Sequence, residues 1–195
     1  MENNSLFILR LSSDEEMKLR IVHGVAPNIH EATIDSICEN AGISRRTFYN
    51  YFSSKHDLSP WYKKFVSGHT VAQIGISCSW AEGFERLFML LEEEREPIMR
   101  TATAHFQGNP TSFDSVVNSA NWSKTRVEQL NTVLEQRGVD ISERYLRYCI
   151  DLYPAIEGYA VRQWLAKPPV ISPKEAAENL ITCVPRPLYE ALCDD

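Results

Sequence analysis

The stretch of sequence that decides the fold reads Thr33-Ile-Asp-Ser-Ile-Cys-Glu-Asn-Ala-Gly-Ile-Ser-Arg-Arg-Thr-Phe-Tyr-Asn-Tyr-Phe-Ser-Ser-Lys-His-Asp-Leu58. After Thr33, a typical N-cap, apolar residues recur at i, i+3, i+4 and i+7, which is the stripe of a helix that packs on a core. Gly42 can adopt the left-handed conformation that ends a helix, and Ser44 can cap the next helix at once. The sequence therefore predicts two helices that cross steeply through a turn of about three residues.

The second of these helices is expected at about residues 45–52, and its two sides differ. On a wheel of 100° per residue, Phe48 and Phe52 share an apolar arc that can pack on a core. The opposite arc presents two guanidinium groups, a phenol and a carboxamide, and such groups can bond base edges in the DNA major groove. The residues on this arc are Arg45, Arg46, Tyr49 and Asn50.

Groups that suit phosphate contacts flank this arc. Hydroxyl groups, backbone amides at helix N-termini and ammonium groups all bind phosphate oxygens. Residues 44–64 also hold five Lys and Arg against a single Asp, although the whole chain has a formal charge of −6. A small basic face on an acidic protein is typical of a surface that meets a polyanion. The candidate phosphate-binding residues are Thr33, Ser44, Thr47, Tyr51 and Lys55.

The apolar spacing is helical along almost the whole chain, so the sequence predicts an all-α protein. Its 195 residues allow one domain or two small ones. The first helix is expected at about residues 14–26, after a capping-box pattern, and the helix before the glycine turn at about 33–40. Further helices are expected at about residues 55 to the 70s, 79–94, 97–105, 112–137, 142–166 and 173–184, with a polar connection at 107–112 and a break at Pro185.

Composition and motifs argue against several classes of protein. The chain has ordinary globular usage, with 44% hydrophobic residues, and no apolar run approaches the ~18–20 residues of a membrane span. Its five cysteines form no CxxC pair, which argues against a disulfide framework and a zinc site. The sequence has no HExxH, no GxSxG and no glycine-rich phosphate loop. We therefore expect a cytoplasmic protein that is not an enzyme and has no metal, cofactor or membrane span.

The residues around the turn resemble the DNA-binding domain of TetR-type bacterial transcriptional regulators. The family's pattern is a threonine-capped helix, an Ala-Gly-Val/Ile-Ser turn, a short helix ending in Tyr-x-Tyr/His-Phe, and a Lys-x-x-Leu. This sequence meets the pattern with Thr33, Ala41-Gly-Ile-Ser44, Tyr49-Asn-Tyr-Phe52 and Lys55-His-Asp-Leu58. The match covers about residues 28–60, whereas the rest of the chain is similar to the family mainly in length and order of helices.

The resemblance implies a helix-turn-helix DNA-binding domain over residues 1–60 and a helical ligand-binding and dimerisation domain over residues 61–195. It implies that the exposed arc contacts bases and that the flanking groups contact phosphates. By residue, the base contacts are Arg45, Arg46, Tyr49 and Asn50, and the phosphate contacts are Thr33, Ser44, Thr47, Tyr51 and Lys55.

The resemblance also implies partners. One short recognition helix makes few base contacts, so two copies on a palindromic DNA operator are expected. The homodimer would form through the helices at about residues 142–166 and 173–184, and a small-molecule effector would regulate it, with repression as the output. Candidate pocket residues, which suit a solid core equally well, are Trp80, Phe84, Phe88, His105, Trp122, Tyr148 and Glu157.

The first helix departs from the family's pattern. Gly24 stands where a bulky aromatic residue is usual, and Pro27 follows shortly after it. We expect Gly24 to remove a core side chain and to loosen the helix by up to ~1 kcal/mol. Leu6, Phe7 or Leu9 would then fill the vacant space.

These departures leave an alternative open. A TetR-like protein that has lost DNA binding would act as a coactivator or as a ligand-binding module. A helical enzyme is a second alternative, although its acids and histidines are scattered along the sequence, so folding would have to assemble any active site.

Overall fold

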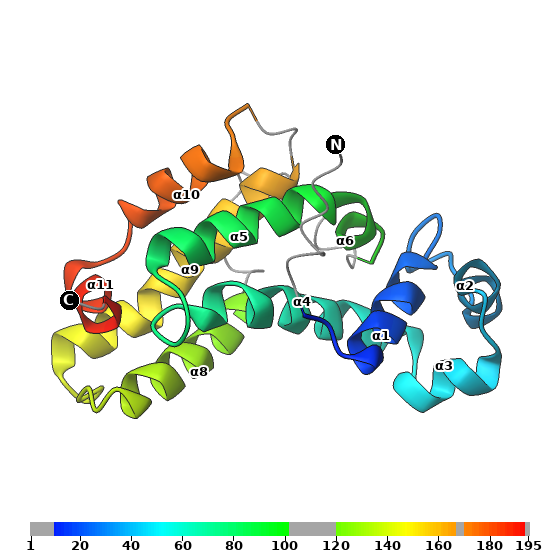
Figure 1. Cartoon of the computed structure of the whole chain (residues 1–195), viewed down its shortest axis with the longest axis horizontal. Coiled ribbons are helices and arrows are strands. Elements are labelled where there is room, and N and C mark those ends of the chain that lie inside the picture. The colour runs from blue at the N-terminus through cyan, green and yellow to red at the C-terminus, as the bar shows by residue number, and fades with distance from the viewer. Residues whose placement is uncertain (1–9, 102–119, 167–169, 194–195) are drawn as a thin grey trace. The chain divides into compact units, whose positions relative to one another are not determined.

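The computed structural model describes residues 10–101, 120–166 and 170–193. Every regular element in these ranges is a helix, so the prediction of an all-α fold is confirmed (Figure 1). No helix in the described ranges combines the length and the apolar character needed to cross a membrane. The helices are α1 (Ser13–His23), α2 (Ile34–Ala41), α3 (Arg45–Tyr51), η2 (Lys55–Asp57), α4 (Leu58–His69), η3 (Val71–Gln73), α5 (Trp80–Glu93), α6 (Arg95–Thr101), α8 (Ala120–Gln136), α9 (Arg144–Ala166), α10 (Pro173–Ile181) and α11 (Arg186–Leu192).

The described chain divides into two compact units. The first consists of residues 10–65 and 93–101, and the second of residues 66–92, 120–166 and 170–193. Helices α1, α2, α3 and α6 lie in the first unit, and α8 to α11 lie in the second. The first unit is therefore assembled from two separate stretches of chain.

Local capping residues position the helices around the glycine turn. Thr33 caps α2, because its Oγ1 accepts the Ser36 N–H at 3.1 Å while Ser36 Oγ accepts the Thr33 N–H at 3.0 Å. Helix α2 ends at Gly42, whose φ of 63° is left-handed. Ser44 caps α3 by accepting the Thr47 N–H at 3.0 Å. The predicted caps and the predicted glycine corner are confirmed.

The first helix is shorter than predicted. It begins with the expected capping box, in which Ser12 Oγ accepts the Glu15 N–H at 3.3 Å and a Glu15 carboxylate oxygen accepts the Ser12 N–H at 2.9 Å. Its last helical residue is His23, however, and Gly24 is its C-cap, so the predicted end near residue 26 was wrong.

The expected loosening of this helix by Gly24 was also wrong. Because Gly24 caps α1 rather than lying inside it, the penalty of a glycine in a helix interior does not apply. A Cβ built on Gly24 would lie 2.7 Å from the Ile37 carbonyl oxygen of α2. The glycine therefore lets the end of α1 approach the α2 backbone, and Leu6, Phe7 and Leu9 lie outside the described residues.

Apolar side chains from α1, α2 and α3 form the core of the first unit. Ile21, Val22, Ile37 and Phe48 are completely buried. Helix α6 packs on α1, and the Arg100 carbonyl accepts the Ile29 N–H at 2.8 Å. The returning stretch 93–101 therefore supplies backbone partners as well as packing to this unit.

In the second unit, α8 and α9 lie side by side and α11 packs against α9 (Figure 1). Gly138, with φ 72°, follows α8 in the short connection to α9, as expected for a helix that stops there. From α5, Trp80, Phe84 and Leu87 are buried in the core.

The end of the chain forms one helix more than predicted. Ser172 caps α10 as expected, but α10 ends at Ile181. The predicted break at Pro185 is instead the N-cap of α11, because a proline lacks only an N–H that the first turn of a helix leaves unbonded. The predicted connection at 107–112 and the start of the helix at 112 lie outside the described residues.

Candidate nucleic-acid interface

The two sides of α3 differ in the structure as their sequence suggests. Phe48 is completely buried and Phe52 is 5% exposed. The Phe52 ring packs edge-on against Trp61 of α4, with ring centroids 5.8 Å apart. These aromatic contacts stabilise α3 through its buried side. The four predicted base-contacting residues, Arg45, Arg46, Tyr49 and Asn50, are all exposed.

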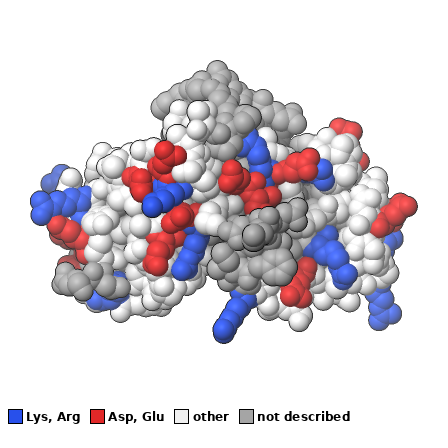
Figure 2. All heavy atoms as spheres, turned by 45° about the horizontal axis from the view of Figure 1, so that its top comes forward, with Lys and Arg blue, Asp and Glu red and all other residues white. Residues whose placement is uncertain are grey.

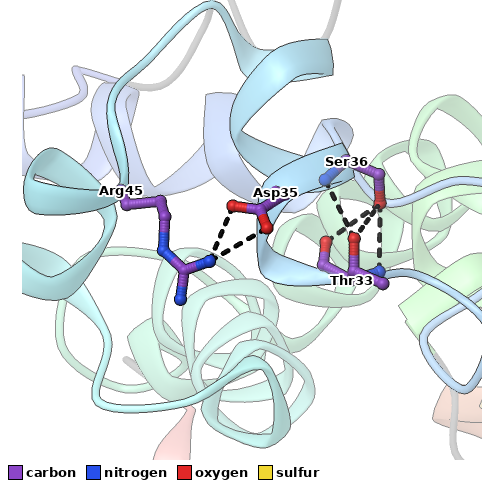
Figure 3. A network of polar contacts seen from close by, with 4 residues as sticks. All are labelled: Thr33, Asp35, Ser36 and Arg45. Atoms are coloured by element: carbon purple, nitrogen blue, oxygen red, sulfur yellow. Dashed lines mark hydrogen bonds and ion pairs between the residues drawn. The ribbon is translucent and has the colours of Figure 1, made fainter.

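Arg45 forms an ion pair with a residue that the sequence reading did not single out. Its Nη1 donates to Oδ1 and Oδ2 of Asp35, on α2, at 2.8 and 2.9 Å (Figure 3). The Asp35 carboxylate, and after it the Tyr49 phenol, raise the pKa of the Arg45 guanidinium. Arg45 therefore lies at the exposed edge of α3 with Asp35 as its ion-pair partner.

Two of the predicted phosphate-binding hydroxyls, those of Thr33 and Ser44, cap helices in this structure. Thr33 and Ser44 both accept backbone N–H groups, as described above, and both are exposed. Ser44 Oγ and Thr47 Oγ1 also lie within hydrogen-bonding distance, at 2.9 Å. Tyr51 is half-buried. Capping fixes where the Thr33 and Ser44 hydroxyls lie, and phosphate contact stays a prediction for all four residues.

Lys55 forms hydrogen bonds within the protein, which the sequence did not predict. Its Nζ donates to the His30 carbonyl at 3.0 Å and to the Ala32 carbonyl at 2.7 Å. An ammonium group has three donors, so one remains for another acceptor. Lys55 therefore anchors the loop that leads into α2, and its contact with a phosphate stays a prediction.

The surface carries both signs of charge. Figure 2 shows basic and acidic side chains interspersed on the face in view, without a large field of one sign. Around α3, the pairing of Arg45 with Asp35 offsets part of the local basic excess.

A second polar cluster of this unit was not predicted. The buried Glu94 carboxylate accepts a hydrogen bond from the Tyr62 hydroxyl and lies 2.7 Å from His23 Nε2. Burial and the Glu94 charge raise the pKa of the Tyr62 phenol. This cluster joins α1 and α4 to the start of the returning stretch.

The predicted pocket residues of the second unit fall into two groups. Trp80, Phe84 and Phe88 are buried, and the Trp80 ring contacts Phe84 and Tyr153 with centroids 5.5 and 6.0 Å apart. Tyr148, by contrast, is 61% exposed on α9 and is not brought into this cluster. Among the other predicted residues, Trp122 and Glu157 contact each other, and His105 lies outside the described residues.

Glu157 is the centre of a buried polar cluster. It accepts hydrogen bonds from Trp122 Nε1 at 3.0 Å and from Arg126 Nε at 3.0 and 3.2 Å. Burial raises the pKa of Glu157, and the charge and hydrogen bonds of Arg126 oppose that rise. In the described part of the chain, Arg126 Nη2 and the Tyr153 hydroxyl are buried without a hydrogen-bond partner. Sequence reasoning missed Arg126, because a basic residue on a polar helix gives no signal that it is buried.

Comparison with known proteins bears on the first unit. Residues 28–59 match the family described as bacterial regulatory proteins, tetR family, and this segment contains α2, the Gly42 corner, α3 and η2. A comparison of the chain with curated proteins finds no match. The helix-turn-helix segment of this chain, residues 28–59, therefore matches the TetR family of bacterial regulatory proteins, which are DNA-binding regulators of transcription.

Proposed function

We propose that this protein is a ligand-responsive transcriptional repressor that binds a palindromic operator as a homodimer. The observation that carries the proposal is the exposed edge of α3, which is backed by buried phenylalanines and follows a glycine corner in the segment that matches the family. A regulator of this kind acts on chromosomal DNA, so the proposal includes a cytoplasmic location.

Within the operator, Arg45, Arg46, Tyr49 and Asn50 contact bases. Arginine bonds guanine O6 and N7, and asparagine bonds adenine N6 and N7. Thr33, Ser44, Thr47, Tyr51 and Lys55 contact phosphates and so set the register of α3 in the major groove.

The experiment that tests this function is selection of bound sequences from a random pool of duplex DNA. We expect enrichment of a palindrome whose half-sites are separated by about one helical turn or more. Failure to enrich any sequence, together with no shift of DNA from the protein's own gene region, would reject DNA binding.

Substitutions in α3 should separate the two kinds of contact. Arg46→Ala or Asn50→Ala should relax base preference at one position per half-site and should lower the free energy of operator binding by about 1–3 kcal/mol. Lys55→Ala should instead weaken binding to all sequences and reduce the salt dependence by about one unit. Binding titrations at several salt concentrations measure both, and melting curves check the loop that Lys55 anchors. Equal, sequence-independent losses in all three variants would contradict these roles.

The proposed dimer forms through α9 together with α10. Four large apolar side chains of α9 are exposed on one side of the helix, which fits a partner helix better than solvent. The resemblance to TetR-type regulators and this stripe together favour a second copy of the chain as the partner. The exposed residues are Tyr145, Tyr148, Leu152 and Ile156.

A charge placed on this stripe should weaken the dimer. Leu152 is 48% exposed, and Leu152→Glu would bury an unpaired carboxylate between the two copies. We expect association to weaken by about 2 kcal/mol or more in sedimentation equilibrium. Ile76→Glu, at a 58% exposed residue between η3 and α5, is the matched control and should leave association unchanged. An unchanged dimer in Leu152→Glu would place the interface elsewhere.

The proposed effector binds in the second unit near Trp80, Phe84, Phe88, Trp122 and Glu157. Buried donors without acceptors are unfavourable, and Arg126 Nη2 and the Tyr153 hydroxyl are two of them. A small molecule with hydrogen-bond acceptors would satisfy both. The effector binds more tightly to the conformation in which the two recognition helices are spread than to the conformation that fits the operator. Its binding therefore lowers operator affinity, at most by the ratio of its affinities for the two conformations.

One observation favours the second candidate, a coactivator or ligand-binding module without DNA binding. Arg45 and Lys55, two of the proposed DNA contacts, already have partners within the protein. A gel shift with the DNA that flanks the protein's own gene distinguishes the two functions. The repressor shifts this DNA, and the coactivator does not.

A further inference from the structure

The ion pair between Arg45 and Asp35 links the two helices of the helix-turn-helix. Arg45 lies on α3 and Asp35 on α2, so the pair spans the glycine corner. The side chains are 57% and 67% exposed, and ion pairs in such surroundings add little to stability. We therefore look for a role of this ion pair other than stabilising the folded state.

The position of the carboxylate is itself well defined. Asp35 lies in the first turn of α2, where a negative charge is favoured by the helix dipole. The reciprocal hydrogen bonds of Thr33 and Ser36 determine where that turn begins (Figure 3). A carboxylate held in this way can restrict an arginine from a neighbouring helix.

The ion pair occupies only part of the guanidinium group. Both hydrogen bonds to Asp35 come from Nη1. Figure 3 shows the second terminal nitrogen of Arg45 pointing away from the carboxylate. An arginine that is supported on one side in this way can still direct two N–H groups at a pair of acceptors.

We propose that Asp35 is a positioning residue of the DNA interface, which presents Arg45 to a single guanine in each half-site. This inference rests on the proposed DNA-binding function. Guanine O6 and N7 accept the two N–H groups of an arginine side by side, whereas phosphate contacts carry no information about the base. Asp35 disfavours a phosphate in the same place, because two negative charges repel. It also reduces the freedom that Arg45 loses on binding.

The test compares Asp35→Asn with Glu39→Gln. Glu39 is an exposed carboxylate on the same helix, so both variants remove one negative charge from α2. Binding is measured to the selected operator, to random DNA, and to a set of operators in which each position is replaced in turn by each of the three other bases. Melting curves show whether each variant is folded.

We expect Asp35→Asn to reduce the preference for guanine at one position roughly tenfold, without weakening binding to random DNA. Glu39→Gln should retain the preference. Arg45→Ala should lose it, and the double variant should lose no more than Arg45→Ala does. Arg45→Lys keeps the charge but not the planar fork, so it should bind random DNA normally and lose the preference.

Three results would overturn the inference while leaving DNA binding in place. They are an unchanged guanine preference in Asp35→Asn, an equal change in Glu39→Gln, and a sharper preference in Asp35→Asn, which would mean that Asp35 competes with DNA for Arg45. Absence of DNA binding by the unmodified protein would reject the proposed function and this inference together.

Discussion

Replacing Arg126 by methionine should lower the free energy of unfolding by about 3–5 kcal/mol, because it leaves a buried carboxylate without its cation. The side chains of Arg126 and Glu157 are only 2% and 0% exposed, and Arg126 Nε donates to both carboxylate oxygens. Trp122 Nε1 would remain as a hydrogen-bond donor to Glu157. Unfolding in denaturant, followed by circular dichroism, measures the loss.

Two controls separate burial from charge. The double variant Arg126→Met, Glu157→Met should recover most of the loss, since an apolar pair of similar size often replaces a buried ion pair without loss of stability. Arg186 pairs with Glu190 on α11, with side chains 87% and 58% exposed, and Arg186→Met should lower stability by less than about 1 kcal/mol. An Arg126→Met variant as stable as the Arg186→Met control would contradict the importance of the buried pair.

The effect of Arg126→Met should also depend on pH. Burial raises the pKa of Glu157 above its ordinary value of 4.5. The Glu157 carboxyl group therefore holds its proton more strongly in the folded state than in the unfolded state. The stabilisation from the protonated form is fully present below pH 4.5 and is lost as the pH rises through the folded pKa. Without Arg126 this pKa rises further, so the deficit should be smaller at pH 5 than at pH 8. A deficit independent of pH would contradict the assignment.

Phe48→Ala should destabilise the first unit by about 3–5 kcal/mol and abolish binding to all DNA sequences. Phe48 is completely buried, and its ring lies 6.1 Å from that of Phe52 and 5.5 Å from that of Tyr49. The cavity would remove the support behind α3, so the exposed edge would no longer have a fixed position. Thermal unfolding and fluorescence anisotropy with labelled operator measure the two effects.

Tyr49→Ala is the matched control, because it truncates the neighbouring aromatic residue of the same helix. Tyr49 is 49% exposed, so we expect little loss of stability and a selective loss of base preference. If Phe48→Ala melted within a few degrees of Tyr49→Ala and bound random DNA equally well, the supporting role of Phe48 would be wrong.

The helix-turn-helix was predictable because its determinants are local. Thr33 and Ser44 bond to N–H groups three residues later, and Gly42 ends α2 through its own backbone conformation. Such interactions depend on neighbours in the sequence, so a pattern of residue types is sufficient to find them. The burial of Phe48 follows in the same way from helical spacing.

The remaining features depend on contacts between distant residues, and no spacing reveals them. Gly24 was misread because the backbone of Ile37 comes so close to it only after folding. The Asp35–Arg45 pair crosses a turn, and the Arg126–Glu157 pair joins two helices. Charged residues at such positions resemble ordinary solvated residues in a sequence. Whether a charge is buried, and against what, is decided by tertiary packing.

The division of the first unit into two stretches has a consequence for protein engineering. Its buried Glu94 and the Arg100 carbonyl that receives the Ile29 N–H both come from the second stretch. An excised fragment ending at residue 65 would expose Tyr62 and leave this amide without its acceptor. A chimera that joins the first unit to another protein should therefore include residues 93–101 as well, joined by a designed linker.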